Sequence, residues 1–247
     1  MSTPIRLLIV LFSCWSAYGS ASAQEHPKNF RAAKKALAEL HRESHTTFYC
    51  GCDYQIQEKQ SDAIKMTSCG LKHRKNAKRA NNLEWEHIVP FSWFYQGRLC
   101  ATGSFRKANC TSSNGKVKSA RKCCAQTDEL ANRFESDLFN LRPAAGEING
   151  DRSNRRYGEI VDEIRKYGTC DFEVDFENKL AEPPPSVRGD IARVIFYMLE
   201  TYGLRISTED LAMYQRWHQD DPVDAVELDL AERTAAVQGN RNRYVTP

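Results

Sequence analysis

Apolar and polar residues alternate through segment 83–90, whose sequence is LEWEHIVP. Alternation of this kind predicts a short, half-buried β-strand, and Pro90 ends it because proline has no backbone N–H to give to a sheet. Neighbouring side chains on a strand point to opposite faces, so Glu86 and His87 are separated by the strand itself. If the backbone twists at the strand end, a metal ligand and a separate base can use that arrangement.

Helical periodicity dominates the rest of the chain. The helices that we expect are Phe30–Ser44, Thr127–Phe134, a short helix capped by Ser136 or Asp137 and running through Leu141, Ile191–Tyr202 capped by Asp190 and ended by Gly203, a helix from Ser207 or Thr208 to about His218, and the acidic segment Asp224–Val237. A second strand is expected at 172–176. The segments 72–82, 97–124 and 144–157 have loop or turn chemistry.

These elements predict one α+β domain that is rich in helix. The chain has 247 residues, 41% hydrophobic and 27% charged, which is ample for a sizeable core. The proline run at 183–185 is expected to separate subregions of one domain.

Residues 1–23 have the features of a signal peptide. Arg6 supplies the positive end, residues 7–12 are apolar, and Ala21-Ser22-Ala23 is a cleavage motif. The apolar run is too short to cross a membrane, and no other stretch is long enough. We therefore expect an exported protein, periplasmic or secreted, whose mature domain is 24–247 and which makes no membrane contact.

Eight cysteines remain once Cys14 leaves with the signal segment. They are Cys50, Cys52, Cys69, Cys100, Cys110, Cys123, Cys124 and Cys170. An even number in an exported chain predicts four disulfides, whereas zinc sites usually need wider spacing than Cys-x-Cys or Cys-Cys. The pairing stays open, although the adjacent Cys123 and Cys124 are expected to pair with other cysteines.

Charge is unevenly distributed. Thirteen lysines and arginines lie between residues 63 and 127, against two acids, Glu84 and Glu86. Either this is solvated surface charge or it forms a basic face for a polyanion. On the second interpretation, basic side chains track phosphates without reading bases. The residues that we expect to contact nucleic acid are Lys75, Arg79, Lys107, Lys118, Arg121 and Arg152.

Hydrolysis of a phosphodiester suits this combination of residues. A histidine can deprotonate a water molecule, and a divalent cation can neutralise the phosphate and the leaving oxygen. Mg²⁺ needs few protein oxygens because it keeps several waters. Glu86 and the amide of Asn140 are therefore a sufficient ligand set, and Arg106 could reach a phosphate with two hydrogen bonds.

Four motifs carry a resemblance to a known family. They are EWEHIVP at 84–90, RKxNC at 106–110, DLFNL at 137–141 and GEINGDRSN at 146–154. Together they resemble the bacterial endonuclease I family of exported nucleases, and the similarity covers nearly all of the mature chain in order. Phe139 stands where the family pattern leads us to expect His, and Arg243 stands where we expect Pro.

The resemblance implies a ββα-metal (His-Me finger) core and dependence on Mg²⁺, with Mn²⁺ or Ca²⁺ as alternatives. It implies sequence-independent cleavage of DNA, and of RNA as well, to products with 5′-phosphates, by an enzyme that we expect to be a monomer. Carried over by motif, His87 is the general base, Glu86 and Asn140 hold the metal, and Arg106 stabilises the phosphate. The alternative is an exported polyanion-binding protein without catalysis, whose charge distribution would be the same.

Overall fold

The computed structural model describes residues 26–43, 45–56 and 63–246. The signal segment at 1–23 and its cleavage motif lie outside these residues. In the described part of the chain, no helix combines the length and the apolar character that crossing a membrane requires.

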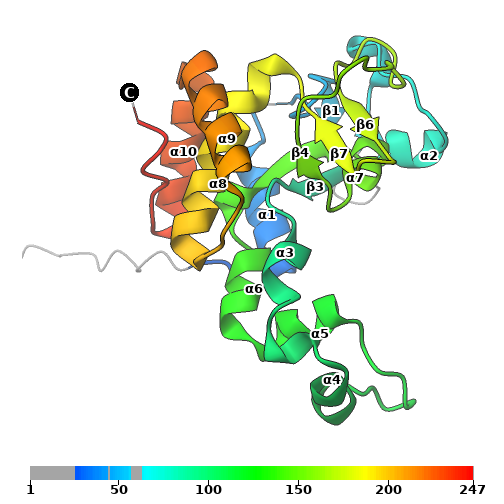
Figure 1. The fold of residues 1–247 in the computed structure, drawn as a ribbon, viewed down its shortest axis with the longest axis vertical. Helices are drawn as coiled ribbons and strands as arrows, with labels where there is room; N and C mark the ends of the chain where they lie inside the picture. Colours follow the sequence, from blue (N-terminus) through cyan, green and yellow to red (C-terminus); the bar gives the residue numbers. More distant parts are fainter. Residues whose placement is uncertain (1–25, 44, 57–62, 247) are drawn as a thin grey trace, which may run out of the picture.

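An antiparallel pair of strands lies at the centre of the molecule (Figure 1). Strand β3 (Leu83–His87) confirms the predicted strand, and it pairs along its whole length with β4 (Leu141–Ala145). The register places Leu83 opposite Ala145 and His87 opposite Leu141. The end of β3 that carries His87 therefore lies beside the start of β4.

The residues between β3 and β4 form a helical lobe, drawn at the bottom of Figure 1. Its helices are α3 (Phe91–Tyr95), η2 (Leu99–Ala101), α4 (Gly103–Asn109), α5 (Ala120–Thr127), α6 (Glu129–Glu135) and η3 (Leu138–Asn140). The prediction of a helix at 127–134 is confirmed by α6. The prediction that 97–124 is a loop is wrong. Thr102 and Ser119 cap α4 and α5, and two disulfides supply buried contacts that the polar sequence lacks.

Helix α7 (Gly146–Arg152) begins directly after β4, where the sequence predicted a loop. Glycines weaken helices, but here tertiary contacts compensate. The buried Glu147 carboxylate accepts hydrogen bonds from the backbone N–H groups of residues 74, 75 and 76. Gly150 also permits a close approach, because an added Cβ would lie 2.1 Å from Nη1 of Arg79. These contacts hold α7 and the short helix α2 (Ala77–Ala80) against each other.

Two small sheets lie beside this centre. Strands β1 (Tyr54–Gln55) and β2 (Ala63–Ile64) form one, and β5 (Arg156–Tyr157), β7 (Leu180–Glu182) and β6 (Glu173–Asp175) form the other, in that order. Strand β6 confirms the strand expected at 172–176. The predicted four disulfides are present, and Cys123 and Cys124 pair with other cysteines as expected. The pairs are Cys50–Cys170, Cys52–Cys69, Cys100–Cys124 and Cys110–Cys123.

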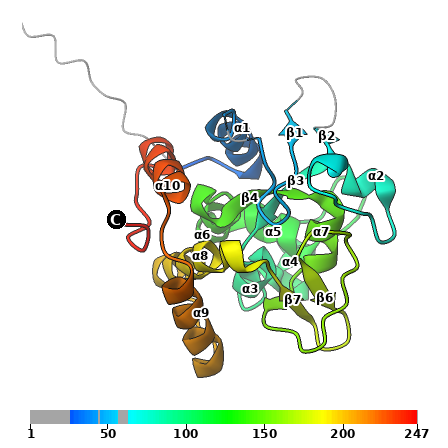
Figure 2. The ribbon, with the colours of Figure 1, turned by 90° about the horizontal axis from the view of Figure 1, so that it is seen from above.

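The C-terminal helices cover one side of the molecule (Figures 1 and 2). They are α8 (Arg188–Tyr202), which follows the short helix η4 (Pro185–Val187), α9 (Thr208–Asp220) and α10 (Ala225–Gln238). All three were predicted, and Ser207 and Gly203 occupy the expected caps. Asp190 does not cap α8, because the helix starts before it; its carboxylate pairs with Arg193 instead.

Helix α1 (Phe30–Leu40) confirms the first predicted helix. It buries Ala33, Leu37 and Leu40 against Leu138 and Leu141, at the junction of η3 with β4. Figure 2 shows α1 next to α10.

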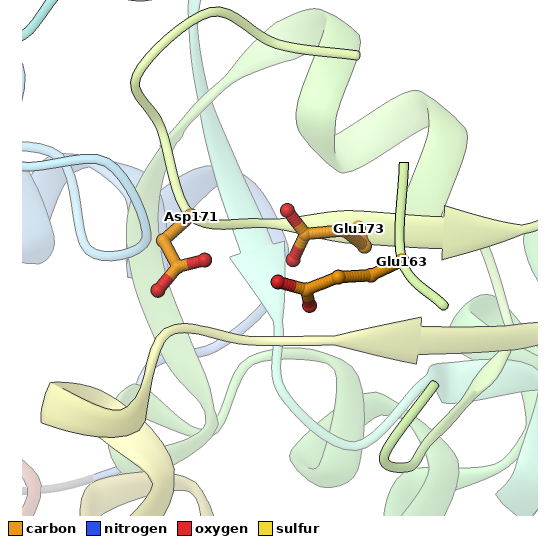
Figure 3. A group of neighbouring side chains, drawn as sticks. All are labelled: Glu163, Asp171 and Glu173. Carbon is orange, nitrogen blue, oxygen red and sulfur yellow. The ribbon is translucent and has the colours of Figure 1, made fainter. Parts of the chain in front are cut away.

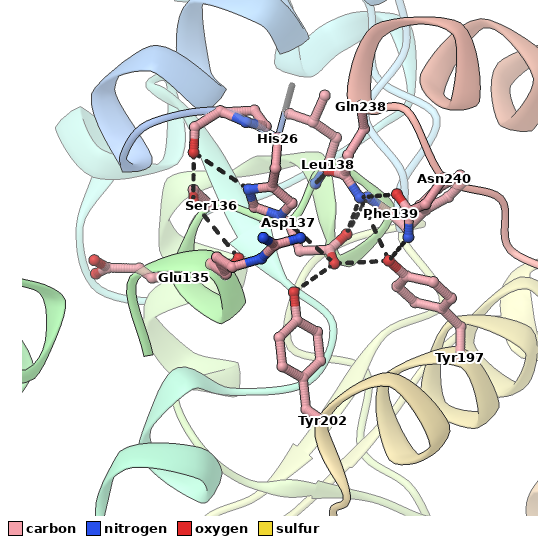
Figure 4. Close-up of polar contacts among 12 residues, drawn as sticks. His26, Glu135, Ser136, Asp137, Leu138, Phe139, Tyr197, Tyr202, Gln238 and Asn240 are labelled. Carbon is pink, nitrogen blue, oxygen red and sulfur yellow. Dashed lines mark hydrogen bonds and ion pairs between the residues drawn. The ribbon is translucent and has the colours of Figure 1, made fainter. Parts of the chain in front are cut away.

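The buried carboxylate of Asp137 connects the strand pair to the C-terminal helices (Figure 4). It caps η3 by accepting from the N–H of Phe139, and it also accepts from the hydroxyls of Tyr197 and Tyr202 on α8 and the amide of Gln238 on α10. The sequence predicted a cap at Ser136 or Asp137, and the structure has it at Asp137. It did not predict that the same side chain binds two distant helices.

Candidate active site

A pocket of about 660 Å³ opens beside β3. All five residues of that strand line it. Helix α7 contributes Asn149 and Gly150, α1 contributes Phe30 and Lys34, and the helical lobe contributes Arg121. The fold thus brings together residues that are up to 124 positions apart in the sequence, from Phe30 to Asn154.

His87 is buried, with 8% of its surface exposed, and its ring packs against Phe30 with centroids 5.1 Å apart. Its Nε2 lies 2.9 Å from the carbonyl oxygen of Glu135. Since a carbonyl can only accept, Nε2 carries the proton and Nδ1 carries the basic lone pair. Burial, helped by the nearby charge of Arg121, lowers the pKa of His87 to about 3, so the imidazole is neutral at physiological pH.

Glu86 is 3% exposed and also lines the pocket. The Tyr49 hydroxyl and Nη1 of Arg152 both donate to its Oε1, at 3.2 and 3.0 Å. Within the described residues, no side chain donates to Oε2, which leaves this oxygen for a ligand. Burial raises the pKa of Glu86 to about 7, although the Arg152 charge opposes the shift. The carboxylate is therefore close to the point at which a proton and a cation compete for it.

Arg152 does not lie on the surface, so the expectation that it contacts nucleic acid is wrong. Its side chain is fully buried and stacks on Tyr157, 4.4 Å from the ring centroid. Besides Glu86, its guanidinium donates to the carbonyls of His87 and Ile88 at 2.6 and 2.5 Å. Arg152 thus joins the end of α7 to the end of β3 and holds both in place.

The structure does not bring Asn140 to the pocket. Its side chain is completely buried, and its amide makes two hydrogen bonds to the backbone of Val89, accepting from the N–H at 2.7 Å and donating to the carbonyl at 3.0 Å. These bonds fix the chain that leaves β3 against η3. With both amide atoms engaged, Asn140 is placed to hold backbone and not to meet Glu86 and His87.

Asn149 and Glu84 lie in the pocket, where Asn140 was expected. Both line the pocket and both are partly exposed. Nδ2 of Asn149 donates to Oε2 of Glu84 at 2.8 Å, which leaves the Asn149 carbonyl oxygen facing other partners. Asn149 was not predicted as a site residue because segment 144–157 was expected to be a loop. Its place in the GEINGDRSN motif was the available signal. This motif forms α7, which follows β4 directly and so lies beside the strand pair.

Arg106 is not among the residues that line the pocket. That residue lies in α4, and its guanidinium donates to the carbonyls of Ala101 and Lys118 at 3.2 and 3.1 Å. Arg121 of α5 is a pocket residue: its Nε binds the Glu135 carboxylate at 2.7 Å, and its side chain is 47% exposed. The guanidinium can therefore reach a solvent-borne anion.

The other expected basic contacts lie at or near the surface. Lys75 and Lys107 are exposed, and Lys118 is partly exposed with its amine on Gln126. Arg79 lines the pocket and forms a two-pronged ion pair with Glu84, with both bonds at 2.9 Å. These four side chains can be approached by a large anion.

Sequence comparisons identify relatives of this chain. The model of the family described as Endonuclease I matches residues 29–247. The chain is 39% identical over 219 residues to Endonuclease-1 of Buchnera aphidicola subsp. Acyrthosiphon pisum (strain APS), covering 88% of this chain and 80% of that protein. It is 38% identical to two proteins of Aeromonas hydrophila. One is an extracellular deoxyribonuclease (221 residues, 89% of this chain and 90% of the relative), and the other is a periplasmic deoxyribonuclease (224 residues, 90% and 87%).

The match extends over nearly all of the described residues and includes the strand pair, α7 and the C-terminal helices. The chain belongs to the Endonuclease I family.

Proposed function

We propose that this chain is an exported, metal-dependent endonuclease that hydrolyses phosphodiester bonds of DNA, and of RNA as well, without sequence preference. The proposal rests on one observation: His87, a neutral histidine, and Glu86, a carboxylate with one oxygen that no side chain of the described residues binds, are adjacent and line the same pocket. Relatives that are named extracellular or periplasmic deoxyribonucleases support the substrate and the export.

His87 is the general base in this proposal. Its Nε2–H is held by the carbonyl of Glu135, so Nδ1 is the nitrogen that accepts a proton from water. The ring is fixed from one side by Phe30. A phosphate anion entering the pocket would raise the low pKa of His87 toward the range in which a base is effective.

The donors around β3 and α7 fit a hard divalent cation. Glu86 offers Oε2 and Asn149 offers its amide oxygen, both in the pocket, and Glu84 contacts the same amide. Carboxylate and amide oxygens are the ligands that Mg²⁺ accepts. We therefore propose Glu86 and Asn149 as the residues that hold it, with Asn149 in place of Asn140. When bound there, the cation would supply Lewis-acid stabilisation of the charged phosphate and of the departing 3′-oxygen.

The strand pair followed by α7 has the order and adjacency of a ββα-metal core, and we propose that assignment for it. Arg152 keeps the Glu86 carboxylate and the end of β3 in fixed positions. Arg121 is our candidate for contact with the scissile phosphate, since it lines the pocket and is half exposed. Arg106 lies outside the pocket and gives Nε and Nη1 to backbone carbonyls, but its remaining N–H groups could still bind a phosphate, so the two arginines have to be tested together.

The proposed test is nicking of supercoiled plasmid by the purified chain in Mg²⁺, in EDTA, and with His87→Ala. His73→Ala is a matched control, because His73 is exposed and lies outside the pocket. We expect cleavage in Mg²⁺, none in EDTA, a loss of at least about a hundredfold in His87→Ala, and no change in the control. Full activity of folded His87→Ala would show that the base is another group.

The same assay separates catalysis from binding alone. A wild-type chain that retards DNA in a gel but cuts nothing with any divalent cation would be the polyanion-binding protein. Cleavage of a labelled RNA oligonucleotide and analysis of the product ends would test the RNA activity and the 5′-phosphates.

A further inference from the structure

Three carboxylates converge on the three-stranded sheet, and none of them lines the pocket around His87 (Figure 3). Glu163 lies in the connection between β5 and β6, Asp171 precedes β6, and Glu173 begins that strand. One oxygen from each lies within 4.8 Å of the other two. Nothing in the proposed nuclease reaction uses these residues.

Glu173 is the unusual member of the group. Only 2% of its surface is exposed, and neither of its carboxylate oxygens has a hydrogen-bond partner among the described residues. Such burial of a carboxylate is costly unless a proton or a cation neutralises it. Burial first, and then the charges of Glu163 and Asp171, raise its pKa to about 7.

The neighbouring groups do not satisfy Glu173. Glu182 lies opposite it on β7, but that side chain is occupied by the N–H of Ile160 and by Arg188. Arg165 binds Asp171 at 2.6 Å and Glu163 at 3.3 Å, and it is half exposed. Arg165 therefore pairs with the two outer carboxylates. Its charge also acts on Glu173, but within the described residues the buried carboxylate has no ion pair of its own.

We propose that Glu163, Asp171 and Glu173 form a Ca²⁺ site that is separate from the catalytic pocket. The donors are all carboxylate oxygens, which favours a hard cation over transition metals that prefer nitrogen or sulfur. Ca²⁺ accepts irregular geometry and completes its six to eight ligands with water, whereas Mg²⁺ demands a near-ideal octahedron. The site would join the connection 158–172 to β6, next to the disulfide from Cys170 to Cys50.

The affinity that such a site needs is modest. Calcium sites of extracellular modules have dissociation constants of about 10⁻⁴–10⁻³ M. At 1 mM Ca²⁺ and a dissociation constant of about 0.1 mM, the ratio of folded to unfolded chain rises about elevenfold. For a chain of this length, that corresponds to an increase of about 3–6 °C in Tm.

The test is thermal unfolding of the whole mature chain with and without 1 mM CaCl₂. We expect this increase in the wild type and in Glu177→Gln, a control that removes one exposed negative charge from the same β-hairpin, and less than about 1 °C in Glu173→Gln. A shift that survives in Glu173→Gln and disappears in Asn149→Ala would place the calcium in the nuclease pocket and overturn the proposal. The proposal is also overturned if calcium does not change the Tm of the wild type and Glu173→Gln has a higher Tm than the wild type without calcium. Glu173 would then be neutralised by a proton and not by a cation.

Calorimetric titration with CaCl₂ keeps the proposal testable if Glu173→Gln does not fold. In the Asn149→Ala background we expect one calcium per chain, lost when Asp171→Asn or Glu163→Gln is added. The absence of binding in that background would overturn the proposal. Neither measurement depends on nuclease activity, so the calcium site can fail while the proposed function stands.

Discussion

Two asparagines are predicted to respond differently to replacement by alanine. Asn140→Ala should lose stability and keep its activity, and Asn149→Ala should lose activity and keep most of its stability. Asn140→Ala removes both partners of the Val89 backbone, which is 2% exposed. Each buried group left unpaired costs about 1–3 kcal/mol, so we expect a loss of about 4 kcal/mol in the free energy of unfolding. At about 2–4 °C per kcal/mol, Tm should fall by about 10 °C.

Asn149→Ala has a different expected outcome. It loses one hydrogen bond, to a partly exposed carboxylate, which costs about 1 kcal/mol and lowers Tm by only a few degrees. Its nicking rate should fall by at least about a hundredfold, because a proposed metal ligand is removed. Asn140→Ala should keep most of its activity at temperatures well below its Tm.

The assay combines calorimetric unfolding with plasmid nicking at 20 °C, in which each variant is titrated with Mg²⁺. A higher Mg²⁺ requirement should appear in Asn149→Ala alone. The reasoning is refuted if Asn149→Ala cuts DNA at the wild-type rate while Asn140→Ala is fully stable and inactive. That result would support Asn140, and not Asn149, as the metal ligand.

Arg152→Met should lower the free energy of unfolding, measured in urea, by about 3–5 kcal/mol, because it leaves the buried Glu86 without its ion-pair partner. A loss below about 1 kcal/mol would contradict the structural role of Arg152. The nicking rate should rise with pH through about 7, because Glu86 must be ionised to accept a cation and its pKa is raised by burial. Higher Mg²⁺ should move that midpoint to lower pH, and a midpoint independent of Mg²⁺ would count against Glu86 as a ligand. Arg121→Ala should reduce the rate at saturating Mg²⁺ more than Arg106→Ala does, and the reverse order would restore Arg106 to the phosphate. Dithiothreitol should abolish activity, since two disulfides hold the lobe that carries Arg121, and equal rates with and without it would refute this.

The strand at the centre could be predicted because its alternation and Pro90 are local signals. The long C-terminal helices could be predicted for the same reason, from periodicity and caps such as Ser207 and Gly203. The cysteine count gave four disulfides, but the pairing depends on which residues the fold brings together.

Helix α7 could not be predicted from local propensity. Its sequence contains two glycines, an asparagine and an aspartate, which favour turns. It is helical because Glu147 binds three backbone N–H groups from the segment 74–76 and because Arg152 donates to the carbonyl of His87 at the end of β3. Both are contacts between distant parts of the chain, and because of them Asn149 lines the pocket, where the sequence predicted Asn140. The burial of Arg152 was missed for a similar reason, since a charged residue in a polar motif normally lies at the surface.

The contacts of Asp137 have a consequence for the order in which this protein is made. Gln238 reaches that carboxylate, and the Leu138 N–H beside it, from a helix synthesised about 100 residues later. The hydrogen bonds of Asp137, four residues before β4, are therefore incomplete while the chain is still growing. In an emerging polypeptide the proposed catalytic residues would lie beside a helical turn whose cap is not yet fully bonded, and the last helix to arrive would supply the missing contacts.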